Sequence, residues 1–485
     1  MSTPFDRRAL LRATAAACAL AAVPLTGAAA HAATSTSATS DTADPDRGSN
    51  ADRALDEAAD AIIRRIRRPR IPRRDVPVTR FGAVADGTTD NTAAIAAAVD
   101  AAHRFGGGRV VIPAGPTGAA SYATGPIHLK SRVELHVETG ATLLFSTDPN
   151  AYLPVVFTRW QGIECYNYSP LIYAYGQTDI AITGGGVLDG QASAANWWAW
   201  KTLETPDFNQ LSAQADAGVP VSQRIYGSGF HLPPAFVEPY NCERVLIQGV
   251  TFRNSSFWHL HPTLSSEVVV EGVTVNSTGP NTDGCDPECC DGVLIDGVTF
   301  DVGDDCIAIK SGRNTDGRRV NVPSQNIVIQ NCSFAAGHGG VTIGSEMTGG
   351  VKNVYGRDLT MNSPILQSGH RLKTNSVRGG YIENSNIYRV SAGQIGGPVL
   401  LIDFNYGEGN TGTFPPTVTG ITLKHWTVNT AKAGWTVAGY STDHIGSIVL
   451  DDITITTMTG TNSAQYVDGF ELVDVTINGQ PVTAP

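Results

Sequence analysis

After its first 32 residues, the sequence lacks any apolar run long enough to cross a membrane, since a spanning helix needs about 20 such residues. It is also short of charge, because only 16% of its residues are Asp, Glu, Lys or Arg. Their balance is negative, at -11, which argues against a nucleic-acid partner held by general electrostatics. With 41% hydrophobic residues and 52 glycines, the composition excludes a disordered chain and favours a globular protein rich in strands and turns.

Cysteine is scarce, with eight residues in a chain of 485. Removal of an N-terminal leader would leave seven, so at least one thiol has no disulfide partner within the chain. Cys285, Cys289 and Cys290 lie close together, but no second close pair and no His pair completes a zinc site. We therefore expect buried thiols in stacked strands, with no metal and no other cofactor.

The N-terminus has the pattern of an export signal over residues 1–32. Arg7 and Arg8 form a twin-arginine-like pair, an apolar run follows over 13–25, and residues 30–32 read Ala-His-Ala, a candidate cleavage site. A membrane anchor is the alternative, but the run is short and a proline interrupts it. We expect a secreted protein that leaves the cell by the twin-arginine route.

Residues 33–75 are expected to form a flexible linker. The first part is rich in Ser, Thr, Ala and Asp, which is typical of disordered tethers. Residues 51–67 place apolar side chains at helical spacing and predict a short helix, which runs into a basic segment over 64–74. Such a segment is usually solvated, and attachment to an anionic cell envelope is the alternative.

The folded domain is predicted to span residues 76–485 and to begin with a capping helix. An alanine-rich segment over 92–103 follows Asp90 and Asn91, which are natural N-cap residues, and three glycines at 106–108 end it. A helix at this end of the domain can cover the open edge of a sheet.

Two short apolar runs, broken by Gly or Asn, recur along the domain. Equivalent positions are Phe252, Val275, Phe300, Phe334 and Met361, with steps of 23, 25, 34 and 27 residues. Such spacing is typical of a repeat architecture, and the lack of long helices between the runs excludes βαβ units. We predict an all-β fold, a right-handed parallel β-helix. A β-propeller is the competing fold, but no four-strand blade signature is present.

Four short polar segments occur among the repeats, at intervals that suit successive coils. They are Asn281-Thr282-Asp283, Gly303-Asp304-Asp305, Gly337-His338-Gly339 and Arg371-Leu372-Lys373. Coils of a β-helix lie about 4.8 Å apart, so these segments can line up on one face. Each segment alone is more often a turn, but together they predict a cluster of three carboxylates, one imidazole and two cations.

In this order, the segments resemble the motifs of the polygalacturonase family of glycoside hydrolases, family 28, over about residues 76–485. Leu372 stands where the family usually has Ile, which is a conservative change. The resemblance implies a pectin-lyase-like fold and hydrolysis, with inversion, of α-1,4-galacturonosidic bonds in pectin or polygalacturonate. The local sequences around Asp283 and Glu346 resemble those of the bacterial, often exo-acting branch of the family. We expect a monomer that acts on a pectic polysaccharide or oligogalacturonide.

The resemblance also implies a role for each site residue. Asp304 is expected to act as general acid, while Asp283 and Asp305 hold and deprotonate a water molecule. Inverting pairs stand about 6.5–9.5 Å apart, and crowding should raise the pKa of at least one carboxyl. His338 is expected to set the proton state of the acid, and Asn281 to position Asp283 or a sugar hydroxyl.

Cations are expected to recognise the acidic sugar. Arg371 and Lys373 are expected to bind the substrate carboxylate, Arg371 through a bidentate fork and Lys373 as a point charge. Further candidates near the cleft are Lys310, Arg313, Arg318 and Arg319 as cations, and Trp258 and His261 as lining residues.

Three rival functions are compatible with a β-helix of this kind. A pectate lyase would use Ca²⁺ and an Arg base, and paired aspartates can bind Ca²⁺. A non-catalytic carbohydrate-binding β-helix would bind the sugar without forming new reducing ends. A third rival is a hydrolase of rhamnogalacturonan or of a substituted galacturonan.

Overall fold

The computed structural model describes residues 45–485. The predicted export signal, residues 1–32, and the first part of the predicted linker, residues 33–44, lie outside the described residues. Among residues 45–485, no helix combines the length and the apolar character needed to cross a membrane.

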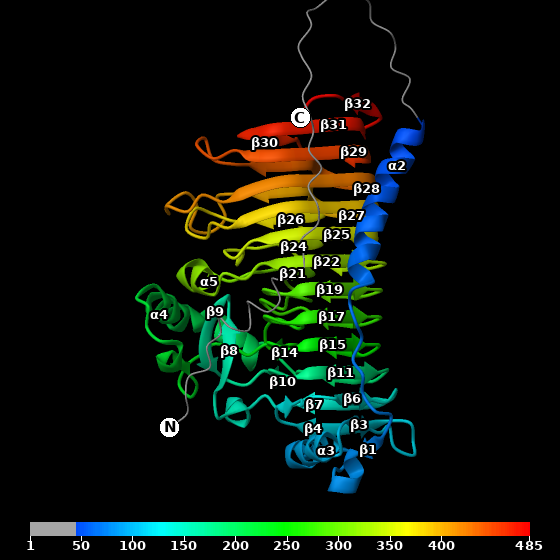
Figure 1. The fold of residues 1–485 in the computed structure, drawn as a ribbon, viewed down its shortest axis with the longest axis vertical. Coiled ribbons are helices and arrows are strands. Elements are labelled where there is room, and N and C mark those ends of the chain that lie inside the picture. The colour runs from blue at the N-terminus through cyan, green and yellow to red at the C-terminus, as the bar shows by residue number, and fades with distance from the viewer. Residues whose placement is uncertain (1–44) are drawn as a thin grey trace, which may run out of the picture. The chain divides into compact units, whose positions relative to one another are not determined.

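Parallel strands wind the chain into a right-handed β-helix, as the repeats predict (Figure 1). Within residues 45–485, the parallel strands of the coils form three stacks, each made by one side of successive coils. The first stack contains β1 (Asp75–Pro77), β3 (Gly108–Ile112), β6 (Val133–Val137), β11 (Thr178–Gly184), β15 (Glu243–Gln248), β17 (Ser266–Glu271), β19 (Asp291–Asp296) and β22 (Ser324–Gln330). The second contains β2 (Asp86–Asp90), β4 (Ala120–Thr124), β7 (Ala141–Phe145), β12 (Val187–Asp189), β16 (Thr251–Arg253), β18 (Thr274–Ser277), β20 (Thr299–Val302) and β23 (Ser333–Ala336).

The third stack positions the polar segments. It contains β5 (Ile127–His128), β10 (Ile172–Tyr175), β14 (Val237–Tyr240), β21 (Ile307–Ile309), β24 (Val341–Ile343), β26 (His370–Lys373) and β30 (Ser463–Gln465). Longer strands bend round the corners and link the stacks towards the C-terminus: β25 (Val351–Ser363), β27 (Tyr381–Asp403), β28 (Thr417–Ala438), β29 (Ile445–Met458) and β31 (Val467–Ile477), the last paired antiparallel with β32 (Gln480–Val482).

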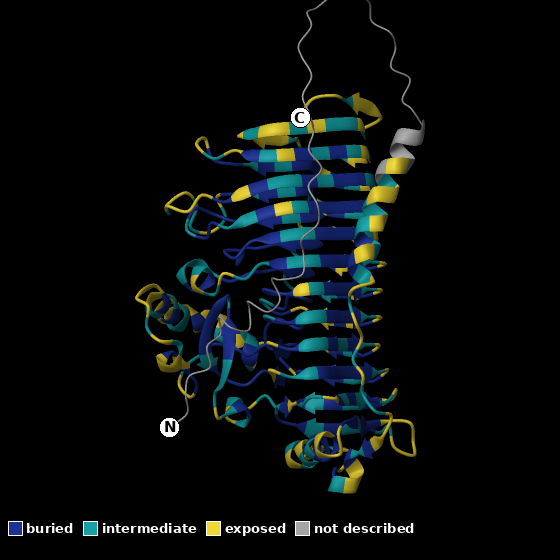
Figure 2. Cartoon of the chain, in the orientation of Figure 1, coloured by how far each residue is buried: buried dark blue, intermediate teal, exposed yellow. Residues whose placement is uncertain are grey.

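The register of the coils follows the sequence repeat. Phe252, Val275, Phe300, Phe334 and Met361 pair in that order across neighbouring coils, and all five side chains are buried. Figure 2 shows this buried interior running along the stack. The bends also follow the prediction, because Gly249 and Asn331 adopt positive φ angles of 76° and 55° at equivalent positions.

A helix covers the N-terminal end of the stack. Helix α3 (Thr92–Arg104) follows Asn91, close to the predicted bounds, and the backbone N–H of Thr92 donates to the Asp90 carboxylate over 2.9 Å. Ile95 and Val99 of α3 join the core that fills the β-helix. A short 3₁₀ turn, η1 (Val78–Phe81), contacts α3.

Residues 51–75 differ from the predicted flexible linker. The expected helix is present as α2 (Pro45–Ile63), and its apolar side chains from Leu55 onward lie against the outside of the first stack. The buried cluster there consists of Ala59, Ile62, Val269, Leu294, Val328, Tyr355 and Tyr388. Composition alone does not predict this contact, because the receiving surface is assembled from outward-facing residues of successive coils.

Ion pairs fix the same segment. Asp56 accepts hydrogen bonds from Arg357 over 2.8 Å, from Arg389 over 3.0 Å and from Tyr388 over 3.0 Å. The basic run pairs with acidic residues of the stack as well: Arg67 with Glu267 over 2.8 Å, and Arg68 with Glu271 over 2.8 Å. Part of the basic run is therefore neutralised within the molecule.

A side wall stands against one flank of the β-helix (Figure 1). We use this name for residues 149–167 and 193–232. Its elements are η2 (Pro149–Tyr152), the antiparallel pair β8 (Val156–Trp160) and β9 (Ile163–Asn167), η3 (Trp197–Thr202), α4 (Glu204–Asp216), η4 (Val221–Gln223) and β13 (Ile225–Tyr226). A second apolar cluster, in which Trp160, Leu211 and Tyr226 pack on Phe257 and Trp258 of a coil, attaches it. Helix α5 (Asn314–Val320) contacts α4.

The cysteines behave as buried apolar residues. All seven cysteines of the described chain are free thiols and buried, which agrees with the prediction from their number and spacing. Burial raises the pKa of the Cys285 thiol well above its usual value, so this group stays protonated.

Candidate active site

The four polar segments meet at one corner of the β-helix. Asp304 and Asp305 lie between β20 and β21, His338 lies between β23 and β24 on the next coil, and Arg371 and Lys373 lie on β26 of the coil after that. Asp283 belongs to the preceding coil. The backbone joins these rungs directly, because His338 N donates to Asp304 O over 2.9 Å and Gly284 N donates to Asp305 O over 3.0 Å.

The three carboxylates form one tight group. One oxygen from each of Asp283, Asp304 and Asp305 lies within 4.8 Å of the other two. Asp283 and Asp305 are buried, whereas Asp304 keeps 18% of its side chain exposed. These nearest oxygens are closer than the expected spacing of about 6.5–9.5 Å for an inverting pair. The reason is that two of the aspartates are neighbours in sequence and the third lies on the adjacent coil.

Asp305 is held by both predicted cations. Lys373 Nζ lies 2.5 Å from Asp305 Oδ2, and Arg371 Nη1 lies 3.3 Å from Asp305 Oδ1. Thr342 Oγ1 donates to the same carboxylate over 3.1 Å. Arg371 Nε has no hydrogen-bond partner among the described residues, so this guanidinium retains a donor for a further acceptor. The ring of Tyr406 lies 5.8 Å from the Arg371 guanidinium and 5.2 Å from Lys373 Nζ.

The proton is distributed differently from the expectation. Burial raises the pKa of Asp304, but the hydrogen bond from His338 and the charge of Lys373 outweigh it and lower that pKa to about 2. His338 Nδ1 lies 3.1 Å from Asp304 Oδ1, and this contact raises the pKa of His338. Below the raised pKa of His338, the Asp304–His338 pair therefore carries its proton on the imidazole and leaves Asp304 ionised.

Burial and crowding both raise the pKa of Asp283. Burial is the largest cause, and the charges of Asp286 and Asp304 add to it. Lys310 Nζ, 3.8 Å from Asp283 Oδ2, acts in the opposite direction. The expectation that crowding raises at least one carboxyl pKa thus applies to Asp283 and not to Asp304.

Asn281 makes a contact that its motif does not predict. Its side-chain oxygen accepts a hydrogen bond from Lys201 Nζ over 2.6 Å, and Lys201 also pairs with Glu204 over 2.7 Å. Lys201 belongs to the side wall, in a segment that contains Trp197, Trp198 and Trp200 and none of the four polar motifs. No motif signals Lys201 or Tyr406, because each reaches the site through packing of a segment distant in sequence.

Several secondary candidates are buried or bound to other groups of the protein. Trp258 and His261 are buried, and His261 Nε2 lies 2.8 Å from Glu288 Oε2 instead of lining a sugar-binding surface. The four additional cations are engaged within the protein. Lys310 and Arg313 pair with Glu346, Arg319 pairs with Glu164 and Asp316, and Arg318 lies over the ring of Phe414.

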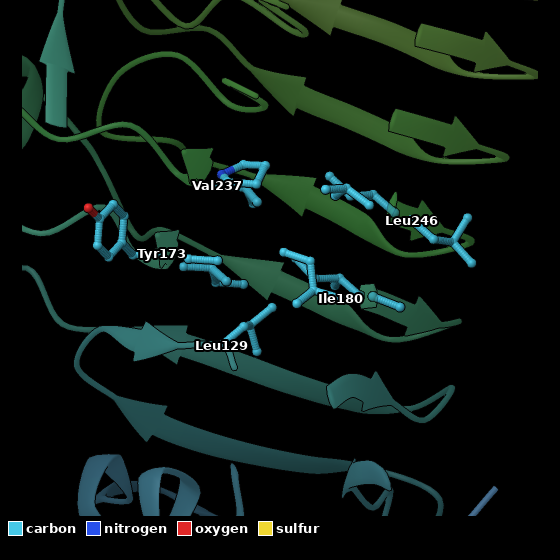
Figure 3. Close-up of a pocket in the computed structure, with 12 residues that line it drawn as sticks. Leu129, Tyr173, Ile180, Val237 and Leu246 are labelled. Carbon is cyan, nitrogen blue, oxygen red and sulfur yellow. The ribbon is translucent and has the colours of Figure 1, made fainter. Parts of the chain in front are cut away.

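A small apolar gap occurs elsewhere, within the early coils (Figure 3). Its lining includes Leu129, Tyr173, Ile180, Val237 and Leu246, with no carboxylate and no cation. It shares no residue with the carboxylate group, so its chemistry does not fit an acidic sugar.

A parallel β-helix that presents clustered aspartates beside an imidazole and two cations has the parts of a glycoside hydrolase. The sequence model described as Glycosyl hydrolases family 28 matches residues 226–477, which is more than half of the chain. The chain belongs to this family.

Known proteins agree with this assignment. A probable polygalacturonase from Vitis vinifera is 28% identical over 393 residues, covering 77% of this chain and 73% of the relative. An exo-poly-alpha-D-galacturonosidase from Dickeya chrysanthemi is 27% identical over 361 residues, covering 69% of this chain and 58% of that protein. The crystal structure of a hyperthermoactive exopolygalacturonase from Thermotoga maritima is 38% identical, with a TM-score of 0.83, and covers 88% of this chain and 96% of that one.

Proposed function

We propose that this glycoside hydrolase cleaves the α-1,4-galacturonosidic bonds of polygalacturonate, the uronic-acid backbone of pectin. The observation that carries the proposal is the placement of Arg371 and Lys373 beside the three aspartates, since a neutral glycan would offer them no carboxylate to bind. The relatives named polygalacturonase support the same substrate. A secreted enzyme would meet this polymer outside the cell.

Asp304 donates the proton to the leaving oxygen, drawing it from the pair that it forms with His338. Asp283 and Asp305 hold the attacking water, and Asp283 accepts its proton. Arg371 and Lys373 hold the sugar carboxylate, and Asn281 presents its amide at the edge of the site. Inversion is proposed from the family resemblance, and NMR of the first anomer released tests it.

We further propose that the enzyme acts from the end of the chain. The side wall contacts the coil just before Asp283, where Lys201 binds Asn281 and the Trp198 ring fills the space beside Gly279, leaving no room for a Cβ. This contact would close one end of the cleft, so that a polymer could enter only from the other. The exo-acting names of two relatives support this mode.

Separation of products over time tests both substrate and mode. Incubation with polygalacturonate should release one short product from the first time point, whereas a ladder of oligomers would show endo attack. Parallel incubation with rhamnogalacturonan tests the alternative substrate. Cleavage of rhamnogalacturonan alone would overturn the proposal.

A Ca²⁺-dependent lyase is the rival that the carboxylate group itself suggests, because its three oxygens are close enough to share a cation. Lys310, Lys373 and Arg371 already supply positive charge to these carboxylates. We therefore expect full activity after treatment with a chelator, and loss of activity that Ca²⁺ restores would favour the lyase.

A further inference from the structure

A buried lysine lies behind Asp283, and the proposed chemistry does not use it. Lys310 directly follows β21 and is only 2% exposed, so it cannot reach a substrate. Its Nζ lies 3.2 Å from Glu346 Oε2, 3.8 Å from Asp283 Oδ2 and 4.0 Å from Asp286 Oδ2. The Trp258 ring centroid lies 4.3 Å from the same atom. An ammonium buried this deeply is stable only if carboxylates around it remain ionised.

Asp286 is the unusual member of this group. It is completely buried, and neither of its carboxylate oxygens has a hydrogen-bond partner among the described residues. The nearest positive charge is Lys310, at the limit of an ion pair. Burial without hydrogen bonds strongly disfavours the charged form of a carboxyl group, because nothing replaces the lost hydration. Asp286 and Asp283 therefore compete for the charge of one lysine.

We propose that Lys310 and Asp286 are positioning residues that set the proton state of Asp283. The ammonium of Lys310 stabilises the Asp283 carboxylate, while the neighbouring carboxyl of Asp286 opposes its ionisation. The inference deepens the proposed function and rests on it, because it requires Asp283 to act as the base.

Charged groups of the neighbouring coils also face Asp283. Asp304 and Asp305, from the following coil, also oppose ionisation of Asp283. On the preceding coil, His259 contacts only the main-chain oxygen of Asp283, with Nδ1 2.9 Å away. Three further charged groups face this cluster. His261 acts on Asp286, and Glu346 pairs with both Lys310 and Arg313. Lys373 neutralises Asp305.

The direction of each pKa shift agrees with this arrangement. Burial raises the pKa of Asp283, Asp286 raises it further, and Lys310 lowers it. Burial also raises the pKa of Asp286, against the charges of Lys310 and His261. Lys310 itself has a raised pKa, since the surrounding carboxylates outweigh burial, so it stays charged over the working range.

The pH profile of kcat/KM tests the inference, because its acid limb reports ionisation of the base in the free enzyme. Lys310→Met removes the charge and keeps an unbranched side chain of similar length, while Glu346 retains Arg313 at 3.0 Å. The acid limb should move upward by about 1–3 pH units, the range for loss of a nearby opposite charge. Lys310→Arg keeps the charge, and its limb should stay near that of the wild type.

Lys424→Met is the matched control. Lys424 is also buried and lies 2.9 Å from each of two carboxylates, those of Asp52 and Asp451, on a surface remote from the site. The acid limb of the Lys424→Met enzyme should stay at the pH of the wild type. An unmoved limb in a folded, active Lys310→Met protein would overturn the inference, as would an equal upward shift in Lys310→Arg.

If Lys310→Met does not fold, Asp286→Asn provides the test of the inference. This change removes the opposing carboxyl, so the acid limb should move downward, and an unmoved limb would overturn the inference. Asp283→Asn tests the proposed function separately. Normal turnover in Asp283→Asn would show that Asp283 is not the base and would reject the proposed function. If Asp283→Asn is inactive but the acid limb of Lys310→Met is unmoved, the proposed function stands and only the role of Lys310 is rejected.

Discussion

At the scale of single residues, neighbouring charges decide which side chain holds the proton. The motif identifies Asp304 and Asp283, but it contains no information on their surroundings. His338 and Lys373 lower the pKa of Asp304 to about 2, while burial and Asp286 raise that of Asp283. These values follow from three-dimensional packing, so the sequence could name the residues of the site and could not assign their proton states.

The first residue-scale prediction concerns the acid. Asp304→Asn should keep the fold and still bind substrate, but kcat should fall by about 10²–10⁴-fold, because an amide cannot supply the proton. Steady-state kinetics on polygalacturonate measures the loss. Asp301→Asn, on strand β20 of the same coil, serves as control and should remain active. A folded Asp304→Asn enzyme with near-normal turnover would exclude Asp304 from this role.

The second concerns the imidazole. Below the raised pKa of His338, the Asp304–His338 pair holds one transferable proton, and above it the proton is lost. Activity should therefore decline as pH rises through that pKa. His338→Gln should remove this basic limb and raise the pKa of Asp304, since the hydrogen bond that lowers it is gone.

His425 is a suitable control for that experiment. It also pairs with carboxylates, Asp52 and Asp452, and its pKa is also raised, but it lies on the surface that contacts α2. His425→Gln should leave the basic limb in place. A basic limb that persists unchanged in His338→Gln would assign it to another group.

The third residue-scale prediction concerns selection of the uronic acid. Loss of a charge-assisted hydrogen bond costs about 1.5–3 kcal/mol, which corresponds to about 10- to 150-fold in kcat/KM. Arg371→Ala should show this loss on polygalacturonate and little change on a methyl-esterified substrate, where no carboxylate is present to be paired. Equal losses on both substrates would mean that Arg371 is structural.

At the scale of elements, the strands were predictable and α2 was only partly so. The repeat gave the register of Phe252, Phe300 and Phe334 because inward positions must stay apolar to fill the core. The helical spacing gave the existence of α2. Its docking was not predictable, because Val269, Leu294 and Val328 point outward and are spaced like any buried strand residue.

The docking of α2 leads to a stability prediction. Ile62→Asp places a charge in a cluster where Ile62 is 8% exposed, and loss of the burial alone should cost at least about 1.5–3 kcal/mol. Chemical denaturation should show a lower midpoint than in Ala61→Asp, whose position on the same helix is exposed. Equal midpoints for the two variants would mean that α2 contributes no stability.

The ion pairs of α2 add a pH dependence to that comparison. Although burial raises the pKa of Asp56, hydrogen bonds from Arg389 and Arg357 outweigh it, so the pKa is lowered on folding. A lowered carboxyl pKa gives stability that is present above the unfolded value and is lost as pH falls through the folded value. The contribution of these half-exposed pairs should therefore fade in acid.

At the scale of the whole molecule, the site depends on two parts of different origin. The β-helix brings Asp283, Asp304 and Arg371 together by coil repetition, and the sequence predicts that arrangement from the apolar repeat together with the spacing of the polar segments. The side wall places Lys201 against Asn281, and this contact could not be predicted, because it depends on how an insertion without repeats packs on the coils. Mode of action is thus the property that the sequence indicates least well.

The most direct test of the central claim is the mass and ultraviolet absorbance of the first products formed from polygalacturonate. A hydrolase adds water to each cleaved bond, so its products should be saturated galacturonates with new reducing ends and no added absorbance. Asp304→Asn should yield almost none of them under the same conditions. Products lighter by one water and absorbing in the ultraviolet would show β-elimination and would contradict the account.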